Sequence, residues 1–468
     1  MLKKFKKTFI GDKEFYHYVL LLVIPMIIQN AITSFVSFLD NIMVGQIGTE
    51  QMSGVAIVNQ LMFVFNICIF GGVSGAGIFG TQFFGKGDHE GHKYTFRFKV
   101  YICLIITAAA LCLFGFMDTQ LISLYLSDNG SVGDISLALK YGKEYLAIMM
   151  IGLIPFAVGQ AYVNTIRETG QTLIPMVASA AAVFVNLILD YLLIFGILGL
   201  PAMGVRGAAI ATVIARFIEC FIVVFWAHTH TDKNLYLVGA YKGFGIPGNI
   251  LKDILKKGTP LMINEMLWAS GMAVISQCYA VRGLEVVAAQ NISSTISNLF
   301  NIVYLQLGGS ISIIVGQLLG AGKLKEAKDA DNKMMFFSVS CCAGISVLMI
   351  LFGQLFPSIY NTEESIKELA RVFIVISALA MPLCAFSHAA YFTLRSGGKT
   401  IITFLFDSVY TWVLIIPFAS FLARHTALPI TAVFFLIQFT EIIKVVIGFF
   451  MIRSNVWMQN IVENTTVQ

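Results

Sequence analysis

The sequence RETGQT at residues 167–172 recurs 228 positions later as RSGGKT at residues 395–400, and each copy follows a long apolar run. A second motif repeats in the same order: TQFFGKG at 81–87 corresponds to GQLLGAG at 316–322, and a Gly-Gly pair precedes each copy. Two motifs that repeat in one order, with a period near 230, indicate that the chain consists of two related halves. Such internal repeats are typical of membrane transporters.

The composition supports a membrane protein. Hydrophobic residues make up 57% of the chain, charged residues only 12%, and the mean hydropathy is +0.81, whereas about 25% of residues are charged in soluble domains. Apolar windows of about 20 residues are long enough to cross a bilayer as helices. They predict twelve spans, at 16–44, 52–80, 94–117, 137–166, 172–197, 205–228, 258–281, 286–319, 333–357, 366–394, 400–423 and 428–452.

Charges and cysteines exclude several other classes. All eight cysteines lie in apolar segments without a CxxC pair, so neither a disulfide framework nor a zinc site is predicted. The net charge of +5 arises from short basic clusters between spans, which leaves no surface for nucleic acid. These clusters recur in alternate loops, and the positive-inside rule therefore predicts that both termini are cytoplasmic. We expect a multi-pass protein of the cell membrane.

The repeat predicts the domain organisation. Six spans per half is an even number, so the two halves share one orientation and are related by an axis along the membrane normal. The predicted fold is all-α, with twelve transmembrane helices in two pseudo-symmetric six-helix bundles. We assign residues 1–228 to the first bundle, residues 229–257 to a cytoplasmic linker and residues 258–468 to the second bundle, and expect the substrate path between the bundles.

Two aspartates lie inside apolar spans, where an ionised carboxylate costs about 2.5–3.5 kcal/mol. Asp40 ends the first span and Asp190 lies late in the fifth, one helical turn after Asn186, while Thr212 lies at similar depth in the sixth. These oxygens suit Na⁺ as a hard cation; alternatively, desolvation and repulsion leave a proton on one carboxylate. Structural hydrogen bonding between helices is the competing interpretation.

A second group of titratable residues lies on the inner side of the second half: Glu265 on span seven, His388 on span ten and Asp407 on span eleven. They are candidates for a second titratable cluster or for contacts with a cationic substrate. Gln160, Asn164 and Gln277 are among the polar residues that could line a wet cavity, although bonding between helices also explains them. Two pairs with i,i+3 spacing, Arg216 with Glu219 and Glu441 with Lys444, are predicted to form ion pairs.

Five motifs together resemble one family. They are LDNIMVG at 39–45, QFFGKG at 82–87, RETGQT at 167–172, NLILD at 186–190 and GVRGAAIAT at 204–212. In this order and on these spans the chain resembles the MATE (multidrug and toxic compound extrusion) transporters. The resemblance implies a V-shaped pair of bundles that alternates between outward-open and inward-open states. It also implies export of cationic or amphipathic compounds in exchange for H⁺ or Na⁺.

In that family the amino-terminal bundle carries the coupling-ion site, which falls on Asp40, Asn186, Asp190 and Thr212 here. Span ten, where many members carry an acid, has His388 and no carboxylate, so a carboxy-terminal cation site of that kind is in doubt. We expect no cofactor besides the coupling ion, a monomer, and small-molecule substrates and membrane lipid as the only partners.

Three other classes of membrane protein fit the sequence less well. A flippase for a lipid-linked precursor, from the same superfamily, shares the repeat, but its central cavity tends to be basic, whereas the intramembrane residues here lean acidic. A membrane-embedded transferase would need an acidic metal cluster such as DDxxD, and an ATP-driven pump a Walker A sequence. The chain contains neither motif, so we expect that it is not an enzyme.

Overall fold

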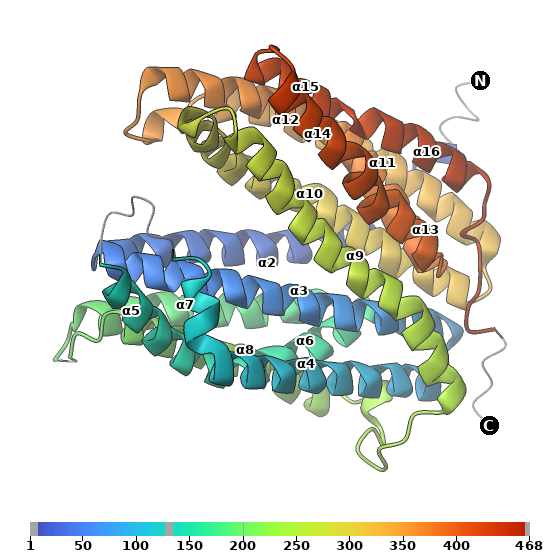
Figure 1. Cartoon of the computed structure of the whole chain (residues 1–468). Coiled ribbons are helices and arrows are strands. Elements are labelled where there is room, and N and C mark those ends of the chain that lie inside the picture. Colours follow the sequence, from blue (N-terminus) through green and yellow to red (C-terminus); the bar gives the residue numbers. More distant parts are fainter. Residues whose placement is uncertain (1–7, 127–133, 200, 464–468) are drawn as a thin grey trace. The chain divides into compact units, whose positions relative to one another are not determined.

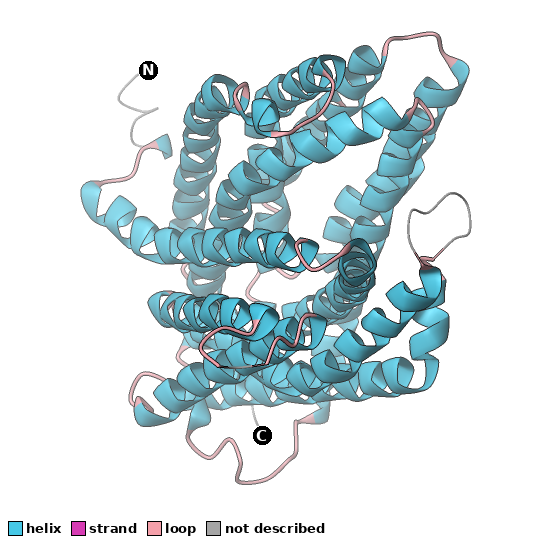
Figure 2. Ribbon diagram, turned by 90° about the vertical axis from the view of Figure 1, so that its left-hand side faces the viewer, coloured by secondary structure: helices cyan, strands magenta, loops and turns pink. Residues whose placement is uncertain are grey.

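The structure is a computed structural model that describes residues 8–126, 134–199 and 201–463, and within this part every regular element is helical (Figure 2). The helices of the first half are α2 (Lys13–Gly45), α3 (Thr49–Lys86), α4 (His89–Ser123), α5 (Ile135–Met149), α6 (Leu153–Glu168), α7 (Leu173–Phe195) and α8 (Val205–Thr229) (Figure 1). Those of the second half are α9 (Gly248–Ala280), α10 (Leu284–Gly320), α11 (Leu324–Gly353), α12 (Glu364–Ser396), α13 (Thr400–Phe404), α14 (Ile416–His425), α15 (Ile430–Phe439) and α16 (Glu441–Arg453).

Eleven helical stretches in the described part are long and apolar enough to cross a membrane. Three of them join shorter helices: α5 with α6, α13 with α14, and α15 with α16. The remaining predicted span corresponds to α9, which is helical over 33 residues but is not among the eleven. Helices therefore cover all twelve predicted spans, and the predicted all-α membrane fold is confirmed.

The described chain divides into two compact units. The first, here called the amino-terminal unit, comprises residues 24–80 and 89–251. The second, the carboxy-terminal unit, comprises the residues before 24, the segment 81–88 and the residues from 252 onward. The end of α3 thus belongs to a different unit from the rest of that helix. The linker assigned from sequence to 229–257 stays a prediction.

Glycines allow the two repeated motifs at 81–87 and 316–322 to touch each other inside the carboxy-terminal unit. A Cβ atom on Gly85 would lie 2.0 Å from the backbone oxygen of Gln317, and one on Gly320 would lie 2.0 Å from that of Gln82. The contact is reciprocal, because each motif supplies one glycine and one carbonyl group. Only a residue without a side chain permits this approach of α3 and α10, as is common where membrane helices pack closely.

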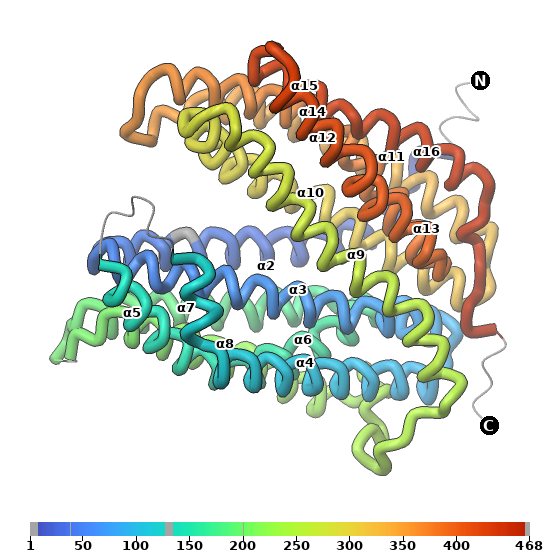
Figure 3. The backbone as a smooth tube through the Cα atoms, in the orientation of Figure 1, coloured from blue at the N-terminus to red at the C-terminus, as the bar shows by residue number. Residues whose placement is uncertain are grey.

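The segment after α16 packs onto the same place (Figure 3). Trp457 is only 1% exposed. The amide nitrogen of the Gln82 side chain donates to the backbone oxygens of Ser396 (2.9 Å) and Gln459 (3.2 Å), and its oxygen accepts from the backbone N–H of Ile461 (2.8 Å). One buried glutamine therefore connects the ends of α3 and α12 with the chain beyond α16.

In the amino-terminal unit, close packing of α7 against α8 sets the depth of the polar residues on both helices. A Cβ atom on Gly207 would lie 2.7 Å from the backbone oxygen of Leu193. Gly196 ends α7 in the left-handed conformation, with φ of 71°, which glycine adopts without strain. The chain can then turn back sharply, and the end of α7 lies beside the start of α8.

Candidate functional site

The structure brings the four residues of the predicted coupling site into one unit. Asp40 lies on α2, Asn186 and Asp190 lie on α7, and Thr212 lies on α8. The carboxyl groups of Asp40 and Asp190 are close enough to interact electrostatically, and Asn186 interacts with Asp190. The hydroxyl of Thr212 donates to the backbone oxygen of Ala208 on the same helix, 3.0 Å away.

Several polar atoms of this cluster have no hydrogen bond. Within the described residues, neither carboxylate oxygen of Asp190 has a partner, and the same is true of one oxygen of Asp40 and of the amide nitrogen of Asn186. Asp190 is only 1% exposed. A buried, unpaired carboxylate is costly unless it carries a proton or contacts a cation. The donor set of two carboxylates, an amide and a hydroxyl therefore fits a proton or a hard monovalent cation.

Tyr145 on α5 belongs to the same cluster and was not predicted. Its hydroxyl interacts with Asp40, Asp190 and Thr212, and it lies 3.4 Å from the side-chain oxygen of Asn59. The sequence placed Tyr145 inside an apolar span but held no local signal that this tyrosine, among sixteen, faces the acids. Only the packing of α5 against α8 and α3 brings it there.

Arg216 does not form the close ion pair that its spacing predicts. Its guanidinium lies 5.0 Å from the ring centre of Phe156, and although it interacts electrostatically with Glu219 and Tyr145, the two charged groups are not within ion-pair distance in the described structure. Glu219 instead accepts a hydrogen bond from the hydroxyl of Ser179 on α7. The predicted Arg216 to Glu219 salt bridge is therefore wrong, because each side chain turns toward a neighbouring helix.

In the carboxy-terminal unit, Glu265 on α9 has a basic neighbour. A guanidinium nitrogen of Arg395 lies 3.8 Å from its carboxylate, and the hydroxyl of Tyr391 donates to it at 3.4 Å. His388 lies against the ring of Tyr304, with ring centres 4.7 Å apart. Glu265 is thus partly neutralised by a residue of the repeated RSGGKT motif.

Asp407 has partners for both oxygens. Lys444 on α16 donates to one oxygen over 2.8 Å, and the side-chain amide of Asn264 donates to the other over 3.1 Å. The spacing had predicted that Lys444 pairs with Glu441, which is wrong: its salt bridge is to Asp407. Asp407 and Glu265 therefore both have a basic neighbour, whereas Asp40 and Asp190 have none among the described residues.

The polar residues predicted to line a cavity are dispersed. Asn164 donates from its amide to the backbone oxygen of Gln160, 2.9 Å away on the same helix α6. Gln277 lies on α9 and is exposed. Gln160 and Asn164 belong to the amino-terminal unit and Gln277 to the carboxy-terminal unit, and their role in substrate binding stays a prediction.

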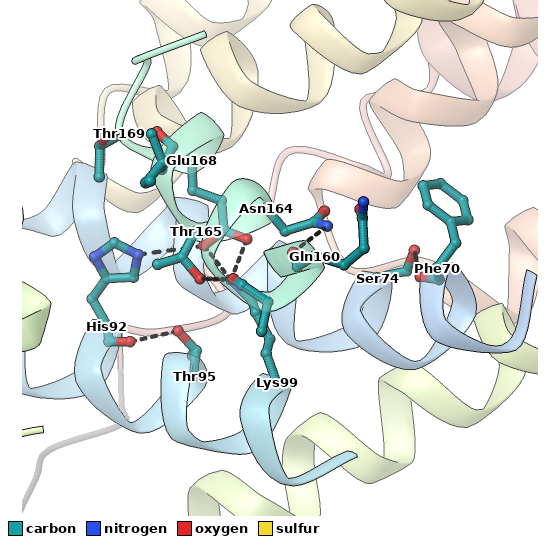
Figure 4. A network of polar contacts seen from close by, with 12 residues as sticks. Phe70, Ser74, His92, Thr95, Lys99, Gln160, Asn164, Thr165, Glu168 and Thr169 are labelled. Atoms are coloured by element: carbon teal, nitrogen blue, oxygen red, sulfur yellow. Dashed lines mark hydrogen bonds and ion pairs between the residues drawn. The ribbon is translucent and has the colours of Figure 1, made fainter. Parts of the chain in front are cut away.

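Figure 4 shows a further buried network, around Glu168 at the end of α6. The ammonium of Lys99 on α4 lies 2.5 and 2.6 Å from the two oxygens of Glu168 and 3.0 Å from the hydroxyl of Thr165. The ring of His92 lies 3.3 Å from the same carboxylate. Glu168 belongs to the repeated RETGQT motif, but the sequence does not predict its charged partners one span away.

Comparison with known proteins places this architecture. The chain matches the MatE family over residues 25–192 and 260–421. The probable multidrug resistance protein NorM of Thermotoga maritima is 23% identical over 405 residues, which cover 86% of this chain and 85% of that protein. Among solved structures, a variant of the Vibrio cholerae MATE transporter VcmN aligns with a TM-score of 0.85 at 16% identity, covering 96% of this chain and 98% of that chain. A MOP superfamily transporter of Pyrococcus furiosus, described as having a binding pocket of reverse polarity, aligns with a TM-score of 0.81 at 19% identity, covering 94% and 95%.

Proposed function

Because this chain belongs to the MatE family, whose similar members are multidrug resistance transporters of the membrane, we propose that it exports cationic or amphipathic compounds by antiport with H⁺ or Na⁺. The proposed coupling site is the cluster of Asp40, Asn186, Asp190 and Thr212. We further propose that the protein resides in the cell membrane with both termini in the cytoplasm.

The observation that supports this proposal most is the contrast between the acid pair Asp40 and Asp190 in the amino-terminal unit and Asp407 in the carboxy-terminal unit. Asp40 and Asp190 interact with each other and have no basic partner, and both oxygens of Asp190 lack a hydrogen bond within the described residues. Asp407 has a lysine at 2.8 Å. A group that drives transport needs two charge states that favour different conformations. Only a carboxylate without a permanent partner changes charge readily when an ion binds or leaves.

The mechanism follows from this difference. When a cation or a proton is bound, it offsets negative charge on the acid pair, and the pair can remain buried between α2, α7 and α8 away from water. When the ion leaves, two carboxylates in a low-dielectric site repel each other and favour contact with water. Tyr145 would favour one charge state electrostatically, since its hydroxyl interacts with both acids and hydrogen-bonds Thr212.

The flippase alternative receives less support from the interior charges. A lipid-linked precursor carries phosphate, which unpaired basic groups would bind. Three basic groups in the interior each have an acidic partner. Lys99 pairs with Glu168, Lys444 with Asp407 and Arg395 with Glu265. These three basic groups are therefore already neutralised by the protein.

A reconstituted assay tests the proposed function. Purified protein in proteoliposomes should move a cationic dye when a pH or Na⁺ gradient is imposed, and the dye should in turn drive movement of that ion. Dye transport that ignores both gradients would contradict the proposal.

A further inference from the structure

Each unit contains a buried polar trio drawn from three of its helices. In the amino-terminal unit the side-chain amide of Gln29 on α2 donates to the hydroxyl of Ser179 on α7 over 2.6 Å, and that hydroxyl donates to Glu219 on α8. In the carboxy-terminal unit the amide of Asn264 donates to Asp407 over 3.1 Å, and Lys444 donates to Asp407 over 2.8 Å.

The two trios occupy equivalent positions of the repeat. Helices α2 and α9 are both 33 residues long and each contains an interior proline, Pro25 or Pro260; Gln29 and Asn264 each follow that proline by one helical turn. Ser179 and Asp407 are separated by the same 228 residues as the motifs RETGQT and RSGGKT. Glu219 and Lys444 lie equally far along the sequence from the first residues of their spans, Val205 and Ile430 respectively.

The charges of the equivalent positions are reversed. The third position is a carboxylate, Glu219, in the amino-terminal unit and an ammonium, Lys444, in the carboxy-terminal unit. The residue three positions earlier reverses as well, from Arg216 to Glu441. In the carboxy-terminal trio the acid therefore has the cation as a direct partner, whereas in the amino-terminal trio the acid Glu219 accepts from a hydroxyl, and the nearby Arg167 donates to Gln29 over 2.5 Å.

The contacts of Lys444 hold its ammonium at Asp407. The residue is 7% exposed, and the ammonium lies 5.4 Å from the ring centre of Phe406 and 5.9 Å from that of Tyr410, within the range of cation–π attraction. Asp407 lies in the first of two nearby π-helical turns, Leu405–Val409 and Thr411–Ile415. Such turns are frequent at functional sites. Because both oxygens of Asp407 are occupied, an external cation would have to displace the lysine.

We propose that Lys444 is a built-in counter-ion, which occupies at Asp407 the position that a coupling ion would otherwise take, so that Asp407 carries no ion during the transport cycle. The inference rests on the proposed function, which it deepens by removing Asp407 from the residues that could carry the coupling ion. The other polar groups that interact with Asp407 or Lys444 are Asn264, Glu265, Cys384, His388, Tyr391, Tyr410 and Glu441. None of them brings a second fixed positive charge.

The test compares Lys444→Met with the neutral pair Lys444→Met/Asp407→Asn and with Lys444→Arg, which keeps the charge. The number of ions moved per cationic dye is measured in proteoliposomes from the dye gradient that each ion gradient sustains. We expect Lys444→Met to move one more H⁺ or Na⁺ per dye, which would raise the sustained dye ratio roughly tenfold under a tenfold ion gradient. Separate H⁺ and Na⁺ gradients identify the ion. The double variant and Lys444→Arg should keep the wild-type number.

Two outcomes would overturn the inference. One is a Lys444→Met variant with the wild-type number of ions per dye; the other is a folded double variant that loses ion dependence, which would make Asp407 itself a coupling group. If Lys444→Met does not fold, the double variant decides, since it removes both charges together. Ion dependence that appears only in Lys444→Met would support the role of Lys444 as the counter-ion of Asp407 but contradict the proposed function, whereas its absence from every variant would contradict both.

Discussion

The ammonium of Lys444 lies 2.8 Å from a carboxylate oxygen of Asp407, so the carboxy-terminal unit neutralises a buried acid with its own side chain. The amino-terminal unit does not do so for Asp190, whose two oxygens lack partners within the described structure. Asp190 and Asp407 thus lie in related halves of the repeat but differ in whether a basic side chain neutralises them.

Tyr145→Phe should weaken the coupling site without unfolding the protein. The substitution removes only the hydroxyl that interacts with Asp40, Asp190 and Thr212. A hydrogen bond of this kind contributes about 0.5–1.5 kcal/mol, or more to a charged group, so the ion concentration for half-maximal dye export should change several-fold. Tyr191→Phe is the matched control, because Tyr191 on α7 is exposed and should leave that concentration unchanged. Equal effects of the two variants would contradict the role of Tyr145.

Lys99→Met should destabilise the protein strongly. Lys99 is fully buried and bonds both oxygens of Glu168, and removing one partner of a buried ion pair costs about 3–5 kcal/mol because the remaining charge is left unpaired. Adding Glu168→Gln should restore much of the loss. Thermal unfolding in detergent measures both effects.

The control for Lys99 is Lys323→Met, which breaks the exposed pair with Glu326 and should cost less than about 1 kcal/mol. A Lys99→Met protein that unfolds at the wild-type temperature would show that the buried pair contributes little.

Gly85→Ala should disrupt the reciprocal contact between the two repeated motifs. Alanine is intrinsically about 1 kcal/mol better than glycine in a helix, but here its methyl group would lie 2.0 Å from the backbone oxygen of Gln317. Overpacking of this kind typically costs about 1–3 kcal/mol. Gly115→Ala on α4, where no atom lies within 4 Å of the added methyl group, should be neutral or stabilising. An unfolding temperature that rises in both variants would refute the close contact.

Trp457→Ala should loosen the segment that follows α16. The indole is 1% exposed, and truncating a buried aromatic residue costs about 3–5 kcal/mol. We expect faster amide hydrogen exchange at Ile461, whose N–H donates to Gln82, and at Gln459, whose N–H donates to the backbone oxygen of Trp457. Exchange that is as slow as in the wild-type protein would show that Trp457 does not hold this segment.

The sequence predicted the features that depend on local composition or on the repeat. Apolar length predicted the spans, and the i,i+4 spacing of Asn186 and Asp190 predicted that they share a face of α7. The sequence did not predict contacts between distant spans. Spacing of three residues suggested that Lys444 pairs with Glu441, but Asp407, 37 positions earlier, is its partner. Tyr145 likewise carries no local signal, because which of its helix faces meets the acids depends on tertiary packing.

The central claim, that ion coupling resides in the amino-terminal unit, is tested most directly by measuring dye-driven ion flux in proteoliposomes for Asp190→Asn and Glu265→Gln. Both changes replace a carboxylate by an amide of the same shape. Asp190→Asn should eliminate ion flux and ion-driven export for every substrate while the protein remains folded. Glu265→Gln, whose acid has Arg395 beside it, should alter substrate preference but leave ion flux measurable. The reverse order of severity would contradict the account and place the coupling site in the carboxy-terminal unit.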